Sequence, residues 1–333
     1  MSFKRLDPED FTFGIDSISA PAWSNFTASL TSLYTSSLQQ DSSNGQYYID
    51  VYNLDPIVNE NAEIQFSITY GDPKGSGSLW YSPANPGISP SKTVYGQFVN
   101  LLLGEDEGAS FDFGESTTTE AFFAIIINRT RYKQAILPGS LRIKGLGENP
   151  NVYITDNSLL PSSLSYTPAG RRYALGSGSF GDGAPYRGLV SYGYLYPDIG
   201  VILLNPESFN STVQSNAWKR DSDENMNNPE RLRQYITEFS LQSQEIITSN
   251  YIFCRARNNE FNFSTQNNFI SSTRNITGSS NAINNDFIKT PPTYITSVGL
   301  YNDNNELLAV AKLSKPLKKD FTTEALIRVK LDF

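Results

Sequence analysis

Histidine is absent from all 333 residues of the chain. The chain therefore lacks the side chain that most often serves as general base, proton shuttle or metal ligand near neutral pH. Serine-histidine-aspartate and cysteine-histidine catalytic arrangements are excluded. Cys254 is the only cysteine, which excludes an intrachain disulfide and a zinc site built of thiolates. This cysteine usage fits synthesis in a reducing cytoplasm, and we expect Cys254 to be a small packed apolar residue.

Long apolar runs are also missing. Lys4 and Arg5 are followed by a Leu-Asp-Pro-Glu-Asp stretch rather than by apolar residues, so we expect no secretory signal. The longest apolar run, residues 121–127, is much shorter than the roughly 20 residues that span a bilayer. We therefore expect no transmembrane segment and no membrane insertion.

Charge is scarce as well. Charged residues make up 18% of the chain, and 34 acidic against 26 basic side chains give a net charge of -8. An acidic protein repels a phosphate backbone, so nucleic acid is not an expected partner. Apolar residues amount to 38% and aromatic residues to 13%, which is too much for a disordered chain.

What the sequence does contain is a pattern typical of strands. Short segments rich in Val, Ile, Tyr, Phe and Thr recur between clusters of Gly, Asn, Ser and Pro. In residues 62–70, apolar Ile64, Phe66, Ile68 and Tyr70 occupy every other position, the period of a strand with one buried face. We predict an all-β or β-dominated α+β protein with a sandwich-like antiparallel core, a few short helices and long loops. The predicted strands cover residues 47–52, 62–70, 121–128, 140–144, 152–155, 192–204, 239–247, 251–264, 294–301, 306–312 and 325–332.

Helices and loops are predicted from spacing and from turn residues. Val94, Phe98, Leu101 and Leu102 recur at helical spacing, which predicts a helix over residues 91–103 that begins at Ser91 and ends at Gly104. Shorter helices are expected over residues 129–137 and, opening at a proline, over residues 229–237. A long exposed loop is expected over residues 72–90, a mostly irregular segment over residues 157–188 and another loop over residues 267–285.

These elements suggest a division of the chain. We predict an N-terminal extended segment at 1–45, a β-rich domain at 46–160 and a second β-rich part at 161–333; the alternative is one domain across residue 160. In the last part, the polar turn at 302–305 predicts a hairpin, to which the strand over residues 325–332 is expected to add as a third strand.

A glycine-rich motif resembles a dinucleotide-binding loop. Gly176, Gly178 and Gly181 have the spacing of such a loop, which requires a helix directly afterwards. Pro185 and Gly188 follow instead and disfavour a helix. We therefore predict a flexible loop and no phosphate site.

Two groups of acidic residues are further candidate sites. Asp221, Asp223 and Asn225 resemble the start of a calcium loop, but the positions that need a glycine and a bidentate carboxylate hold Met226 and Leu232. We predict a solvated acidic loop there.

A second acidic cluster could in principle supply the paired carboxylates of a glycosidase. No apolar pocket is evident nearby to raise one carboxylate pKa, so we predict a charged loop. We thus predict no catalytic, cofactor-binding or metal-binding residues and no cofactor. The cluster consists of Glu105, Asp106, Glu107, Asp112 and Glu115.

Several longer segments carry a resemblance to a known class of proteins. Residues 70–77 (YGDPKGSG), 95–103 (YGQFVNLLL), 127–139 (INRTRYKQAILPG), 196–206 (YPDIGVILLNP) and 294–316 (YITSVGLYNDNNELLAVAKLSKP) are similar to those of structural proteins from contractile-tailed bacteriophages. Phages of marine bacteria and cyanobacteria are the notable examples. The most specific parts are YPDIG and the terminal GLYNDNNELLAVAK, which also resembles segments of tail-collar and fibre-attachment proteins.

This resemblance implies a virion component, made in the host cytoplasm, with no enzyme activity. We expect a tail subunit, in the baseplate, that is present in multiple copies and binds other virion structural proteins. A neck, fibre-attachment or capsid-surface protein is the alternative within the same class. From other classes, a carbohydrate-binding adhesin and a glycan-cleaving tail enzyme stay open.

Overall fold

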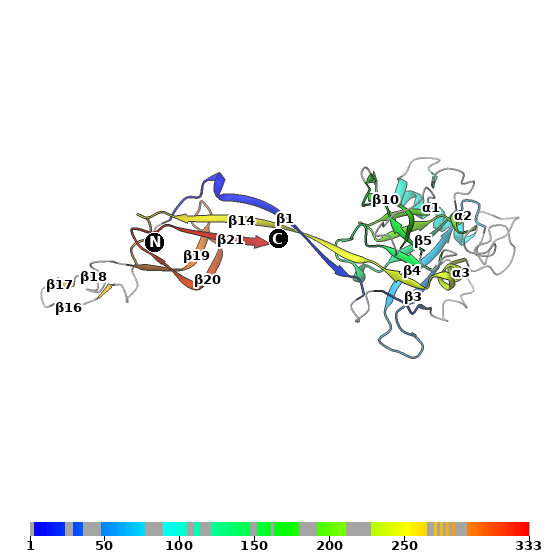
Figure 1. Cartoon of the computed structure of the whole chain (residues 1–333), viewed down its shortest axis with the longest axis horizontal. Coiled ribbons are helices and arrows are strands. Elements are labelled where there is room, and N and C mark those ends of the chain that lie inside the picture. The colour runs from blue at the N-terminus through cyan, green and yellow to red at the C-terminus, as the bar shows by residue number, and fades with distance from the viewer. Residues whose placement is uncertain are drawn as a thin grey trace. The chain divides into compact units, whose positions relative to one another are not determined.

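The protein is described by a computed structural model in which strands dominate (Figure 1). The chain divides into two compact units: unit 1 is Met1–Asp16 with Ile246–Phe333, and unit 2 is Ser17–Glu245. The chain passes between them twice, within β1 (Phe11–Pro21) and within β14 (Gln242–Ala256). The structure describes residues 3–23, 29–35, 48–76, 89–104, 110–113, 121–146, 152–160, 163–179, 192–210, 228–264, 270–271, 274–275, 278–279, 282–283 and 292–332.

Unit 2 is built on one large antiparallel sheet. The central strands β4, β5 and β12 are paired side by side, with Ile68 opposite Ile125 and Ile125 opposite Ile202. The order across the sheet is β13 (Glu238–Ser240), β7 (Arg142–Lys144), β8 (Val152–Asp156), β10 (Gly170–Ser179), β11 (Gly193–Tyr196), β12 (Val201–Leu204), β5 (Phe122–Ile127), β4 (Ile64–Gly71), β3 (Tyr48–Tyr52) and β2 (Tyr34–Thr35), while β9 (Ser165–Thr167) pairs with β10.

Both faces of this sheet are buried, which explains the continuous apolar sequence of β5. Successive strand side chains point to opposite faces, and Phe123 and Ile125 belong to one hydrophobic cluster while Phe122 and Ala124 belong to a second. The first cluster includes Phe239, whose ring stacks on that of Phe66 at 4.9 Å between centroids. A strand with two buried faces reads as an unbroken apolar run rather than as an alternation.

Helices complete the two clusters. α1 (Pro90–Leu103) contributes Val94, Tyr95, Val99 and Leu102 to the second cluster. α3 (Asn228–Tyr235) contributes Leu232 to the first. The shorter helices are η1 (Pro8–Asp10), η4 (Arg129–Arg131) and α2 (Glu207–Asn210).

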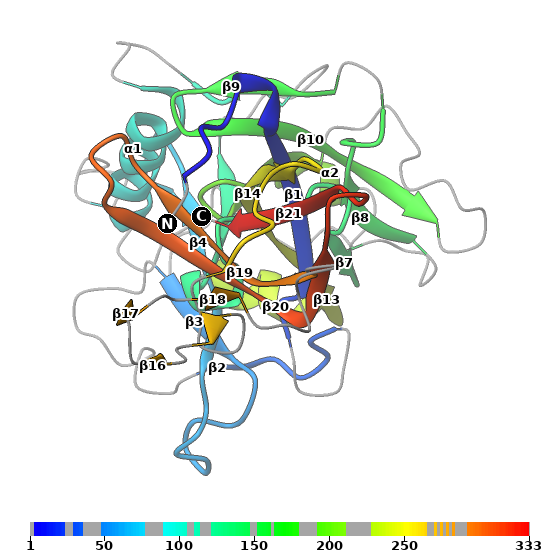
Figure 2. The ribbon, with the colours of Figure 1, turned by 90° about the vertical axis from the view of Figure 1, so that its left-hand side faces the viewer.

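Unit 1 holds the C-terminal strands. β19 (Thr293–Tyr301) and β20 (Leu307–Lys319) form an antiparallel hairpin, drawn in orange in Figure 2. β21 (Ala325–Asp332) pairs along its length with β14, and the sheet order is β1-β14-β21. Where the structure describes it, the segment before the hairpin holds only two-residue strands. These are β15 (Ile270–Ser271) with β18 (Ala282–Ile283), and β16 (Arg274–Asn275) with β17 (Gly278–Ser279).

The fold-class prediction is confirmed, since antiparallel strands dominate and helices are few and short. The helix expected over residues 91–103 and the hairpin around residues 302–305 are present. The strand expected over residues 192–204 is a hairpin, because the turn over residues 197–200, with Gly200 at φ 69°, separates β11 from β12.

Other local predictions were wrong. The helix expected over residues 129–137 is reduced to η4, after which β6 (Ala135–Ile136) pairs with β14. Residues 157–188 are not mostly irregular where the structure describes them, because β9 and β10 lie there. The two strands expected at 239–247 and 251–264 are instead the short β13 and the long β14.

The pairing of the final strand was also predicted wrongly. β21 forms its ladder with β14, from Ser249 opposite Asp332 to Ala256 opposite Ala325, and not with the β19–β20 hairpin. The division into units likewise follows the long-range pairing. Residue 160 lies inside unit 2, where β8 and β10 pair on either side of it.

Candidate functional site

The glycine-rich motif lies in a strand. Gly176 is opposite Thr155 and Gly178 is opposite Tyr153 in the β8–β10 ladder. The prediction of a flexible loop is therefore wrong for these two residues, and Gly181 lies outside the described residues. Within the described part of this motif, the glycines are not followed by a helix whose N-terminus could bind a phosphate.

The acidic motifs fall largely outside the described residues, which include neither Asp221, Asp223, Asn225 and Met226 nor Glu105, Asp106, Glu107 and Glu115. Leu232 is buried in the first hydrophobic cluster. The main-chain oxygen of Asp112 accepts a hydrogen bond from the Tyr194 hydroxyl at 2.5 Å. Across the described ranges, no three Cys, Asp or Glu side chains are grouped as a metal site would require.

Cys254 is half-buried in β14. Burial, together with the nearby charge of Asp10, raises the pKa of its thiol. A raised pKa keeps the thiol protonated at neutral pH, and the thiolate is the nucleophilic form. This agrees with the expected role as a packed residue.

A charged clamp joins β10 of unit 2 to the turn before β12. The Arg171 guanidinium donates to both oxygens of Asp198, with Nη2 to Oδ1 at 2.6 Å, and the Arg171 main-chain N–H donates to Oδ2 at 2.8 Å. Partial burial opposes ionisation of Asp198, but the bonds from Arg171 outweigh it, so its pKa is lowered. A Cβ on Gly170 would lie 2.6 Å from Asp198 Oδ2. Arg171 and Asp198 neutralise and hydrogen-bond each other, so we assign the clamp a structural role.

Asp156, at the end of β8, is fully buried. Burial raises the pKa of its carboxyl group, although it accepts a hydrogen bond from the Gly139 N–H at 2.7 Å. A raised carboxyl pKa is a feature of catalytic acids. Asp156 is nevertheless sealed from solvent, so a substrate could not reach it without local opening of the fold.

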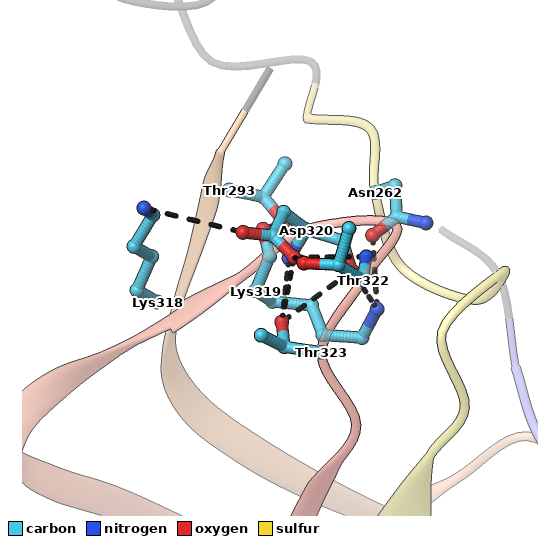
Figure 3. A network of polar contacts seen from close by, with 7 residues as sticks. All are labelled: Asn262, Thr293, Lys318, Lys319, Asp320, Thr322 and Thr323. Carbon is cyan, nitrogen blue, oxygen red and sulfur yellow. Dashed lines mark hydrogen bonds and ion pairs between the residues drawn. The ribbon is translucent and has the colours of Figure 1, made fainter. Parts of the chain in front are cut away.

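In unit 1, a network of polar contacts surrounds a buried lysine where β20 ends (Figure 3). Lys319 is fully buried, and its Nζ donates to the main-chain oxygens of Asn258 at 3.0 Å and Asp320 at 2.9 Å, and to Asn262 Oδ1 at 3.0 Å. An ammonium group has three N–H donors, and here each has one acceptor.

This network holds two segments of unit 1 together, and we name it the Lys319 network. The three acceptors of Lys319 are neutral oxygens from two segments, residues 258–262 and residue 320, so the ammonium fastens these segments together. The adjacent Thr293 hydroxyl donates to Phe261 O at 2.8 Å. Hydrogen bonds from Thr322 and then Thr323 lower the pKa of Asp320 to about 2. A nucleophilic amine needs a free lone pair, whereas this one has all its protons engaged.

The other distinctive feature of unit 1 is apolar surface. Phe11, Phe13 and Ile15 occupy alternate positions of β1, and we name these three residues the open row. Phe13 is 74% exposed, Ile15 75% and Phe11 44%. On the hairpin, Leu307, Leu308 and Val310 are also exposed. The largest contiguous apolar patch on a protein, typically of a few hundred Å², is often a functional site.

Sequence reasoning missed both features. The open row alternates in the sequence FTFGID with the same period of two as residues 62–70, whereas only an extended segment is predicted over residues 1–45. Lys319 had no comparable signal, because a lysine in a Lys-Lys-Asp sequence is normally exposed.

Comparison with known proteins adds no assignment, because no family model, curated protein or solved structure matches the chain. No helix in the described ranges is long and apolar enough to cross a membrane.

Proposed function

We propose that this protein is a structural subunit of the tail of a contractile-tailed bacteriophage, positioned in the baseplate, and that it acts through protein-protein interfaces. The proposal combines the resemblance of its sequence segments to virion proteins with the surface of unit 1. A neck, fibre-attachment or capsid-surface position is the alternative within the same class.

The observation that carries the proposal is the uneven distribution of apolar side chains. Among the described residues, both hydrophobic clusters consist of unit 2 side chains. The buried apolar residues of unit 1 are only Ile252, Ala256, Ala325 and Val329, again counting the described residues. A folded unit of this size normally buries more, so a neighbouring chain is the natural partner for its exposed apolar side chains.

The paired charged groups of the protein also support a structural role. Arg171 and Asp198 satisfy each other, and Lys319 has an acceptor for each of its three donors. Such groups hold segments in place and are not poised for proton transfer or nucleophilic attack.

The test is to locate the chain in particles purified from the source of the sequence. Quantitative mass spectrometry should give a fixed copy number per particle, and cryo-electron microscopy should place the chain in the tail. Purified full-length protein should neither bind a glycan array nor release reducing ends from host polysaccharide. Absence from the particles would overturn the proposal, and so would release of reducing ends.

A further inference from the structure

We infer that the open row of unit 1 is a self-association surface whose occupant is a second copy of this chain. The direction in which the row points follows from its neighbours in β1. A Cβ on Gly14 would lie 2.8 Å from the Tyr251 ring, and Asp16 Oδ2 lies 3.2 Å from Lys330 Nζ. Positions 14 and 16 of β1 therefore face the side of the β1-β14-β21 sheet that carries Tyr251 and Lys330.

The open row consequently belongs to the opposite face. Side chains of a strand alternate between faces, so Phe11, Phe13 and Ile15 point away from Tyr251. The register places Ile252 opposite Val329 and Cys254 opposite Ile327, and these residues share that second face. The second face is therefore largely apolar, whereas the face with Tyr251 and Lys330 mixes charged Arg328 with apolar Phe253 and Leu326. On the apolar face Ile252 and Val329 are buried, whereas Phe13 and Ile15 are three-quarters exposed.

The size of the row suits the centre of a protein-protein interface. An aromatic side chain carries roughly 150–250 Å² of surface, so the three residues expose on the order of 300–400 Å². A stable interface buries about 800 Å² on each partner, a little over half of it apolar. The open row therefore supplies most of the apolar surface that such an interface needs, and aromatic residues are enriched at interface centres.

Charge favours a second copy over a partner of opposite charge. Unit 1 has 12 basic and 11 acidic residues, a net charge of +1, which leaves 14 basic and 23 acidic residues, a net charge of -9, for unit 2. Two nearly neutral units approach each other without net repulsion, and a near-neutral unit attracts neither a polyanion nor a polycation over a distance. Lys330 is moreover paired within the unit, with Asp16 and Asp332.

A self-complementary apolar row favours an isologous contact, in which the same residues from each copy meet about a two-fold axis. This inference names the partner of the surface on which the proposed function rests. It fails separately from that function. A chain that self-associates but is absent from virions would keep the inference and overturn the proposed function.

The experiment compares full-length double variants by sedimentation velocity over a range of concentrations. Phe13→Thr with Ile15→Thr removes the row while keeping residues that favour strands. Ile57→Thr with Val58→Thr is the matched control, because these unit 2 residues are 72% and 76% exposed. The wild-type chain should associate with a dissociation constant in the micromolar range. The row variant should weaken this about 10–100-fold, and the control should leave it unchanged.

A second variant keeps the test decisive if the row variant folds poorly. In a Cys254→Ala background, Phe13→Cys should form a covalent dimer under mild oxidation, whereas Val58→Cys should not. A wild-type chain that stays monomeric would overturn the inference, as would a row variant with wild-type association. An associating Phe13→Cys chain that forms no covalent dimer would also overturn it, and so would a monomeric chain that uses this row to bind a different virion protein.

Discussion

The buried Lys319 provides a sharp test of how unit 1 holds together. The perturbation is Lys319→Met, which keeps the length of the apolar stem and removes the three donors. Asn258 O, Asn262 Oδ1 and Asp320 O each lose a bond of about 3.0 Å or less. Lys318→Met is the matched control, because the Lys318 side chain is 61% exposed and its Nζ lies 4.0 Å from Asp320 Oδ2.

The expected magnitude follows from two opposing terms. A hydrogen bond to a charged group contributes about 1.5–3 kcal/mol, so three of them amount to about 4.5–9 kcal/mol. Replacing the ammonium by a thioether also removes the cost of burying a charge, which is several kcal/mol. We expect Lys319→Met to destabilise unit 1 by about 3 kcal/mol. Lys318 is exposed and its contact with Asp320 is long and screened by solvent, so the control variant should leave the stability of unit 1 almost unchanged.

Hydrogen exchange measured by mass spectrometry is the suitable assay because it reports each unit separately. A loss of about 3 kcal/mol should accelerate exchange in β14, β20 and β21 by about 100-fold, if these amides exchange through opening of unit 1. Strand β5 of unit 2 should be unaffected. Wild-type protection in the Lys319→Met variant would refute the claim that the Lys319 network stabilises unit 1, as would equal acceleration in the Lys318→Met variant.

Two further predictions concern a core ring and a titrating carboxylate. Phe239→Ala should destabilise unit 2 by about 3–5 kcal/mol in chemical denaturation. The reason is that this ring is fully buried and packs on Phe66 and Trp23. The control is Phe321→Ala, at a 58% exposed position, which should cost less than about 1 kcal/mol. Because the pKa of Asp320 is lowered from 3.8 to about 2, its contribution to unit 1 is present above pH about 3.8 and is lost as the pH falls toward 2. Asp320→Asn should therefore remove part of the acid sensitivity of β20 and β21 in exchange measurements, and an unchanged pH profile would contradict this.

How much could be predicted from the sequence depended on whether the signal was local. The hairpin of β19 and β20 was found because its polar turn lies between two apolar segments, with Asn305 at φ 62° in the turn. Strand β5 was found because both of its faces are buried. The helix α1 was found, but its buried residues include Tyr95 and Val99, whereas Leu101 from the predicted apolar stripe is exposed. The other three residues of the predicted stripe do face the core, since Val94 and Leu102 are buried and Phe98 packs against the second cluster.

Non-local pairing accounts for the larger errors. The alternation of apolar residues in β21 fits any neighbouring strand, so it did not distinguish the hairpin from β14, whose last residue lies 69 positions before Ala325 along the chain. In β10, Gly176 and Gly178 resembled loop residues by composition. They are accommodated in a strand because β8 pairs with them along the ladder, and tertiary context overrides the weak strand propensity of glycine.

Self-association would link the stability of unit 1 to protein concentration. Binding that occurs only to the folded state raises the free energy of unfolding by RT ln(1 + [L]/Kd), which is about 2.7 kcal/mol when the partner is present at 100 times the dissociation constant. Unit 2 has two hydrophobic clusters of its own and should not share this dependence. Protection from hydrogen exchange should therefore rise with concentration in β21 and stay constant in β5. Because the row variant associates about 10–100-fold more weakly, its β21 should show nearly constant protection over the concentrations at which protection of the wild-type chain rises. A concentration dependence in that variant would mean that another surface of unit 1 provides the contact.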